Sequence, residues 1–147
     1  MAPPIIGPAG QVCEENINHK VIKLSGNRTS TLYLLNPTQR QVVRILVDNC
    51  AIYVGPRCDW LVRARDDISN EEIFVELKGS DLDHAVKQLE ATIPQLAADP
   101  KHGSKRCYVA CTRNPLTDTE TQRYKLRFKR DYNARFLPAR DGAREPL

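Results

Sequence analysis

Asp59, Glu76 and Lys78 are the residues of this chain whose types and spacing could do chemistry. Side chains alternate between the two faces of an extended strand, so a strand over 72–78 would place Glu76 and Lys78 on the same face. A hairpin would pair this strand with 58–64. In an antiparallel pair the start of one strand lies beside the end of the next, which would bring Asp59 close to both. Two neighbouring carboxylates repel unless a cation lies between them, and a hard cation such as Mg²⁺ prefers oxygen ligands.

The alternative is that these charges have no chemical role. An exposed Glu-x-Lys triplet is usually a solvated face with a weak ion pair, and an Asp beside a turn is often only a cap. The surroundings favour a site, because both strands are apolar and Gly79-Ser80 leads directly into an amphipathic helix. We therefore expect the three residues at the edge of a core.

The elements that would position them follow from the apolar pattern. A meander of short antiparallel strands is expected over 31–35, 41–48, 51–54, 58–64 and 72–78. It is followed by a helix with Ser80 as its N-cap and Pro94 near its end, a strand over 106–112, a helix over 118–132 behind a capping box at Thr117, and a short strand over 135–137. Residues 12–24 could form a short helix or an irregular lead-in. This order predicts an α/β sandwich with a mixed central sheet flanked by helices.

The 147 residues are enough for one domain, and 41% hydrophobic with 27% charged residues argues against a largely disordered chain. We expect a flexible N-terminal tail over 1–11, a single domain over 12–137 and a loose C-terminal tail over 138–147. No stretch is apolar enough for a membrane helix, and the N-terminus has no secretory signal. Five cysteines, an odd number, then predict reduced thiols and a cytoplasmic protein. Their spacing resembles no zinc knuckle, so small buried residues are the better interpretation.

The order Asp59, hairpin, Glu76-Leu77-Lys78 resembles the D…(D/E)-x-K signature of the PD-(D/E)XK nuclease superfamily. The phrase over 55–93 is also similar to small prokaryotic members of that superfamily, and the resemblance covers about residues 30–132. It implies a restriction-endonuclease-like fold. It also implies that Asp59, Glu76 and the Leu77 carbonyl hold Mg²⁺, with Mn²⁺ as a substitute, and that Lys78 acts in catalysis.

Further residues are implied by the same resemblance. Gln88 resembles a glutamine that some members place near the site; the alternative is an ordinary residue at the boundary of the helix's apolar face. Many members add an acid from their first helix, and Glu14 or Glu15 could fill that role. Cys58 stands where many members have proline, and this difference touches no ligand.

The second feature is the basic helix over 118–132, with five basic residues and no acid between Arg123 and Arg130. Arg123, Arg127 and Arg130 would lie opposite an aromatic stripe and could contact phosphates. The alternative is a solvated amphipathic helix. The net charge of +4 is compatible with a nucleic-acid partner.

These features predict a metal-dependent nuclease that acts on nucleic acid, expected to be DNA, as a homodimer presenting two sites. The alternative is a nuclease-like binding or regulatory module without turnover.

Overall fold

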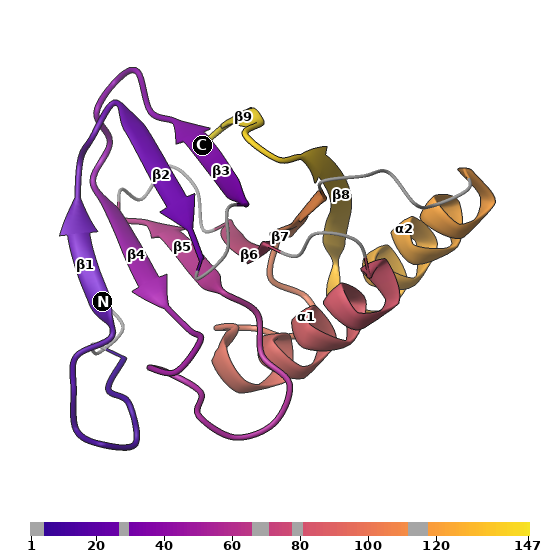
Figure 1. Ribbon diagram of the computed structural model, residues 1–147, viewed down its shortest axis with the longest axis horizontal. Coiled ribbons are helices and arrows are strands. Elements are labelled where there is room, and N and C mark those ends of the chain that lie inside the picture. Colours follow the sequence, from indigo (N-terminus) through magenta and orange to yellow (C-terminus); the bar gives the residue numbers. More distant parts are fainter. Residues whose placement is uncertain (1–4, 27–29, 66–70, 78–80, 112–117) are drawn as a thin grey trace.

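The computed structural model describes residues 5–26, 30–65, 71–77, 81–111 and 118–147. Figure 1 shows two helices on one side of a strongly twisted sheet and a smaller sheet on the other. The elements in chain order are β1 (Glu14–Ile17), β2 (Val21–Ser25), β3 (Thr31–Leu35), β4 (Val42–Leu46), β5 (Trp60–Ala64), β6 (Glu72–Leu77), α1 (Leu82–Leu96), β7 (Lys105–Cys111), α2 (Asp118–Tyr132), β8 (Ala134–Arg140) and β9 (Arg144–Pro146).

The larger sheet has six strands in the order β1-β4-β5-β6-β7-β8. The first four are antiparallel neighbours, whereas β6-β7 and β7-β8 are parallel. Parallel strands need a crossover connection, and α1 and α2 supply the two crossovers. Because both crossovers lie on the same face, the two helices pack side by side over β6, β7 and β8 (Figure 1).

The smaller sheet has the order β2-β3-β9 and covers the opposite face of the larger one. The alternation of β6 divides the interior accordingly. Phe74 points into the core under the helices, and Ile73 and Val75 point into the core against the smaller sheet. All three are at most 3% exposed, so β6 is buried on both faces.

The predicted restriction-endonuclease-like α/β sandwich, with helices flanking a mixed central sheet, is wrong. Strand residues make up 41% of the residues that the structure describes, and helix residues 23%. In the described part of the chain, both helices cover one face of the six-stranded sheet, and the second sheet covers the other. The architecture is therefore a β-rich fold of two mixed sheets.

The difference arises mainly at the N-terminal end, where residues 12–24 were expected to form a short helix or an irregular lead-in. In β2 the side chains of Val21, Lys23 and Ser25 are exposed, whereas Ile22 and Leu24 are fully buried. This alternation is the two-residue period of a half-buried strand. Ile22 and Leu24 fill the second core with residues of β3 and β6, which a helix could not do in the same register.

Most other predicted elements are present with shifted ends. The expected strand over 51–54 is absent from the described residues, and only an isolated bridge joins Ile52 to Asp48. Asp81 caps α1, its carboxylate accepting the His84 N–H at 3.0 Å. The predicted caps Ser80 and Thr117 lie outside the described residues.

Described residues near both chain ends form backbone contacts. Within the expected flexible tail, the Gly7 N–H donates to the Gln11 carbonyl at 2.8 Å, and Ile6 forms a bridge with Val12. At the other end, β9 pairs in parallel with β3, and the buried Arg106 donates to the Pro146 carbonyl at 2.6 Å. Part of the segment 138–147 thus belongs to β8 and β9.

No helix in the described ranges is long and apolar enough to span a membrane.

Candidate functional site

Asp59 lies where β5 begins, at the end of its pairing with β6. The last paired residues are Trp60 and Val75, and Asp59 extends the ladder by one step. Its N–H donates to the Val75 carbonyl at 3.0 Å, and its Oδ2 accepts the Leu77 N–H at 2.7 Å. The carboxylate thus takes the position of a backbone acceptor, which holds Asp59 against the Glu76–Leu77 peptide.

Glu76 is almost completely buried, at 2% exposure. A carboxylate rarely occupies such a position, because removal of its charge from water costs several kcal/mol without compensation. Phe74, two residues before it in β6, points into the core beneath the helices. Glu76 therefore lies in the interior of the protein, near the end of the buried strand β6.

The pKa of the Cys58 thiol is affected by the carboxylates near it. Its side chain is fully buried, and burial raises the pKa of the Cys58 thiol well above its usual range. The neighbouring Thr92 side chain opposes this shift, whereas the charges of Glu76 and Asp59 both raise the pKa further. The thiol is therefore neutral, and the carboxylates are close enough for their combined field to act on it.

Gln88 lies beside the site on α1. Its side-chain oxygen accepts the Arg57 N–H at 3.0 Å, two residues before Asp59. Arg57 in turn binds Asp48 through Nε at 2.8 Å and Asn49 through its terminal nitrogen at 2.7 Å. Gln88 thus anchors the backbone that leads to Asp59.

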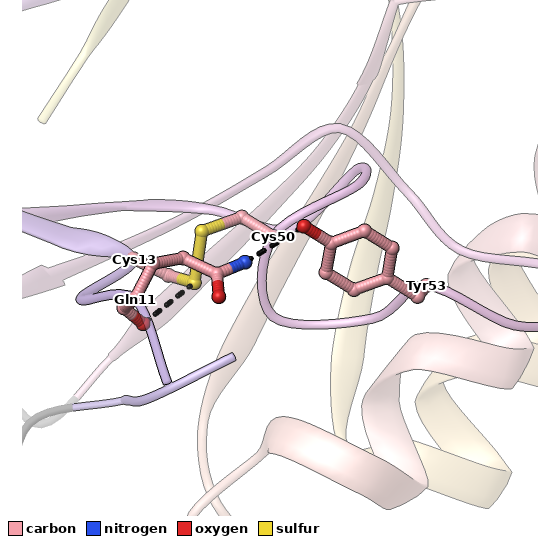
Figure 2. Close-up of a disulfide and its surroundings, with 4 residues drawn as sticks. All are labelled: Gln11, Cys13, Cys50 and Tyr53. Atoms are coloured by element: carbon pink, nitrogen blue, oxygen red, sulfur yellow. Dashed lines mark hydrogen bonds between the residues drawn. A yellow bond between two sulfur atoms is a disulfide. The ribbon is translucent and has the colours of Figure 1, made fainter. Parts of the chain in front are cut away.

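A disulfide ties this same loop to the N-terminal segment (Figure 2). Cys13, just before β1, is bonded to Cys50, and the Gln11 side-chain amide donates to the Tyr53 hydroxyl at 2.8 Å. The prediction that all five cysteines are reduced is wrong for this pair. Cys58, Cys107 and Cys111 are free and buried, as expected for small core residues.

The structure thus brings some predicted residues together and separates others. Asp59 meets the Glu76–Leu77 peptide, and Gln88 contacts the adjacent backbone. Lys78 lies outside the described residues. Glu14 and Glu15 are in β1, where they form ion pairs with Arg65 at 3.7 Å and Arg44 at 3.1 Å.

No family model, curated protein or solved structure matches this chain. In the part of the chain that the structure describes, no group of three or more His, Cys, Asp or Glu side chains could hold a metal ion. A cation at this place would depend on the two carboxylates together with backbone oxygen.

The basic helix α2 forms side-chain contacts with α1 that the sequence did not predict. Arg127 forms a bidentate ion pair with Glu90 of α1, with its Nε 2.9 Å from Oε2, and Tyr132 donates to the same carboxylate at 3.1 Å. Burial and the neighbouring Glu90 raise the pKa of Tyr132 to about 12, so this hydroxyl keeps its proton at neutral pH. Arg127 therefore joins the two helices.

The other two arginines differ from Arg127. Arg130 is 73% exposed and pairs with its neighbour Asp131 at 2.7 Å. Arg123 lines a groove of about 370 Å³ between α1 and α2 together with Lys87, Asp83 and Glu120. Within the described ranges Arg123 forms no ion pair. Of the three arginines, Arg127 and Arg130 form ion pairs, and Arg123 forms none with a carboxylate of the described residues.

This difference makes the arginines separable by experiment. Arg127→Ala should lower the free energy of unfolding by about 1 kcal/mol, because a bidentate and partly buried pair is lost. Arg123→Ala should leave stability unchanged and, if α2 contacts phosphates, reduce the slope of log affinity against log salt by about one unit. Urea unfolding and fluorescence anisotropy with a labelled DNA duplex measure the two effects. Equal stability of both variants would contradict the assigned role of Arg127.

Sequence reasoning missed two parts of this site. The disulfide could not be found, because spacing alone does not give a pairing. Thr92 accepts the Cys58 N–H at 2.8 Å, and the available signal was its position one turn after Gln88 on the same helix.

Proposed function

We propose that this protein is a metal-dependent nuclease whose site is formed by Asp59, Glu76 and Leu77. The observation that carries the proposal is the hydrogen bond from Leu77 N–H to Asp59 Oδ2, which joins the aspartate to the peptide of the buried glutamate. Further support comes from the resemblance of Asp59 and Glu76-Leu77-Lys78 to the nuclease signature. Nucleic acid, expected to be DNA, is the proposed substrate.

The donor set fits a hard divalent cation. Asp59 and Glu76 offer carboxylate oxygens and Leu77 offers a peptide carbonyl, which are the ligand types that Mg²⁺ takes in proteins. When bound, Mg²⁺ would polarise the scissile phosphodiester and lower the pKa of an attacking water.

The chain's own residues would divide the remaining work. Asp59 and Glu76 would supply negative charge to the site, and the Leu77 N–H would fix the orientation of Asp59. Lys78 is proposed to orient the water or to stabilise charge on the phosphate in the transition state. Gln88 would act through the backbone at Arg57, since its side-chain oxygen accepts that N–H. The chain would act as a homodimer if both strands of a duplex are cut together, which light scattering with product analysis would show.

The direct test is cleavage of supercoiled plasmid and of single-stranded DNA with Mg²⁺ or Mn²⁺, with EDTA as the control. We expect metal-dependent cleavage, with 5′-phosphate ends as the resemblance implies. Absence of cleavage of DNA and of RNA in both metals would contradict the proposal. Retained DNA binding without metal binding would assign the protein to the class of binding modules.

A further inference from the structure

Thr92 is a fully buried polar residue in the third turn of α1. Its Oγ1 lies 2.8 Å from the Gln88 carbonyl and 2.8 Å from the Cys58 nitrogen. A carbonyl oxygen can only accept, so the hydroxyl hydrogen must point to Gln88. A lone pair of Oγ1 then accepts the Cys58 N–H, so the hydroxyl acts both as a donor and as an acceptor.

This hydrogen bond replaces one that a sheet would normally supply. Cys58 precedes β5, and its buried N–H would cost about 1–3 kcal/mol if it had no acceptor. The neighbouring amides are held as well: Arg57 N–H by Gln88, and Asp59 N–H by the Val75 carbonyl at 3.0 Å. Three successive amides are therefore fixed, two by α1 and one by β6.

We propose that Thr92 is a positioning residue that sets where the Asp59 carboxylate lies relative to Glu76 and Leu77. The consequence for metal binding rests on the proposed function, whereas the effect on Asp59 itself does not. The link is short, because Cys58 and Asp59 share a peptide bond and Asp59 Oδ2 must reach the Leu77 N–H at 2.7 Å. Partners that orient metal ligands typically affect metal affinity by about 10–100-fold when they are removed.

Thr92→Val keeps the shape of the side chain and removes both hydrogen bonds, and Thr92→Ser keeps the hydroxyl. Ile93→Val is the matched control, since Ile93 is fully buried at the next position of α1 and its side chain packs in the core under the helices. Two measurements are made on each variant. The NMR shift of the Leu77 amide proton reports its hydrogen bond to Asp59, and calorimetry with Mn²⁺ reports affinity.

We expect Thr92→Val to move the Leu77 amide proton to lower ppm and to weaken Mn²⁺ binding by about 10–100-fold. Thr92→Ser should restore both values, and Ile93→Val should lower stability while changing neither. An unchanged Leu77 amide shift in Thr92→Val would overturn the proposal, whether or not the wild type binds Mn²⁺. A wild type that binds no Mn²⁺ would instead overturn the proposed function.

If Thr92→Val does not fold, Gln88→Met tests the other hydrogen bond by which α1 holds this backbone, the one to the Arg57 N–H. It should move the Leu77 amide proton in the same direction, because the backbone entering Asp59 loses its other anchor on α1. No movement of that signal in the folded Gln88→Met variant would contradict a positioning role for Gln88 and Thr92.

Discussion

Asp59→Asn should reduce the cleavage rate by about 10³-fold, equivalent to about 4 kcal/mol of transition-state stabilisation. The substitution removes one negative charge from the proposed metal site. It keeps the size of the side chain, and the amide oxygen can still accept the Leu77 N–H that Asp59 Oδ2 now accepts at 2.7 Å. The fold should therefore be preserved while the affinity for the cation falls.

The rate is measured as relaxation of supercoiled plasmid in Mg²⁺, and thermal unfolding checks that the variant is folded. Asp131→Asn is the matched control, because Asp131 is a carboxylate on α2 that pairs with its exposed neighbour Arg130. The control should cleave at the wild-type rate. Unchanged cleavage by folded Asp59→Asn would remove Asp59 from the site.

The second large effect concerns the disulfide between Cys13 and Cys50, whose positions are 37 residues apart in the sequence. Closure of a loop of this size lowers the entropy of the unfolded chain, which corresponds to a stabilisation of about 4 kcal/mol. The Cys13→Ser/Cys50→Ser variant should lose about that much free energy of unfolding. The loss should come from the unfolded state, since β1 keeps its backbone pairing with β4.

Urea unfolding with and without a reducing agent measures this loss. The wild type should be destabilised by the reductant, whereas the double variant should not respond to it. Titration of thiols under denaturing conditions should give three free cysteines in the oxidised wild type, because Cys58, Cys107 and Cys111 are unpaired. Five free thiols, together with stability that does not depend on reductant, would contradict the disulfide.

The disulfide also bears on where the protein works. Disulfides persist mainly in oxidising compartments, and the prediction of a cytoplasmic protein was based on reduced thiols. That premise holds for only three of the five cysteines. The cytoplasmic location stays a prediction.

The sequence was informative where one local pattern determined the element. In β6, strict alternation separated Phe74 from Ile73 and Val75, and these side chains do enter opposite cores. The hairpin between β5 and β6 followed from two apolar strands around a polar loop, and it correctly brought Asp59 to the Glu76–Leu77 peptide. Both helices were predicted from their apolar spacing.

The sequence was not informative where partners distant in the chain determine the structure. Strand β9 has three residues and exists because β3, more than 100 positions earlier, offers a free edge. The role of Arg127 depends on Glu90, which belongs to another helix. In each case the sequence pattern alone was also compatible with a solvated segment. Only the pairing with a distant part of the chain shows that the segment is packed.

Calorimetric titration of the wild type and Glu76→Gln with Mn²⁺ tests the central claim most directly, with Asp131→Asn as the control. Glu76 is 2% exposed, so the neutral and isosteric glutamine removes the buried charge while preserving the packing of β6. The proposed site predicts one binding event in the wild type and in Asp131→Asn, and its loss in folded Glu76→Gln. Equal Mn²⁺ binding by the wild type and Glu76→Gln, or no binding by any of the three, would contradict a metal site at Asp59 and Glu76.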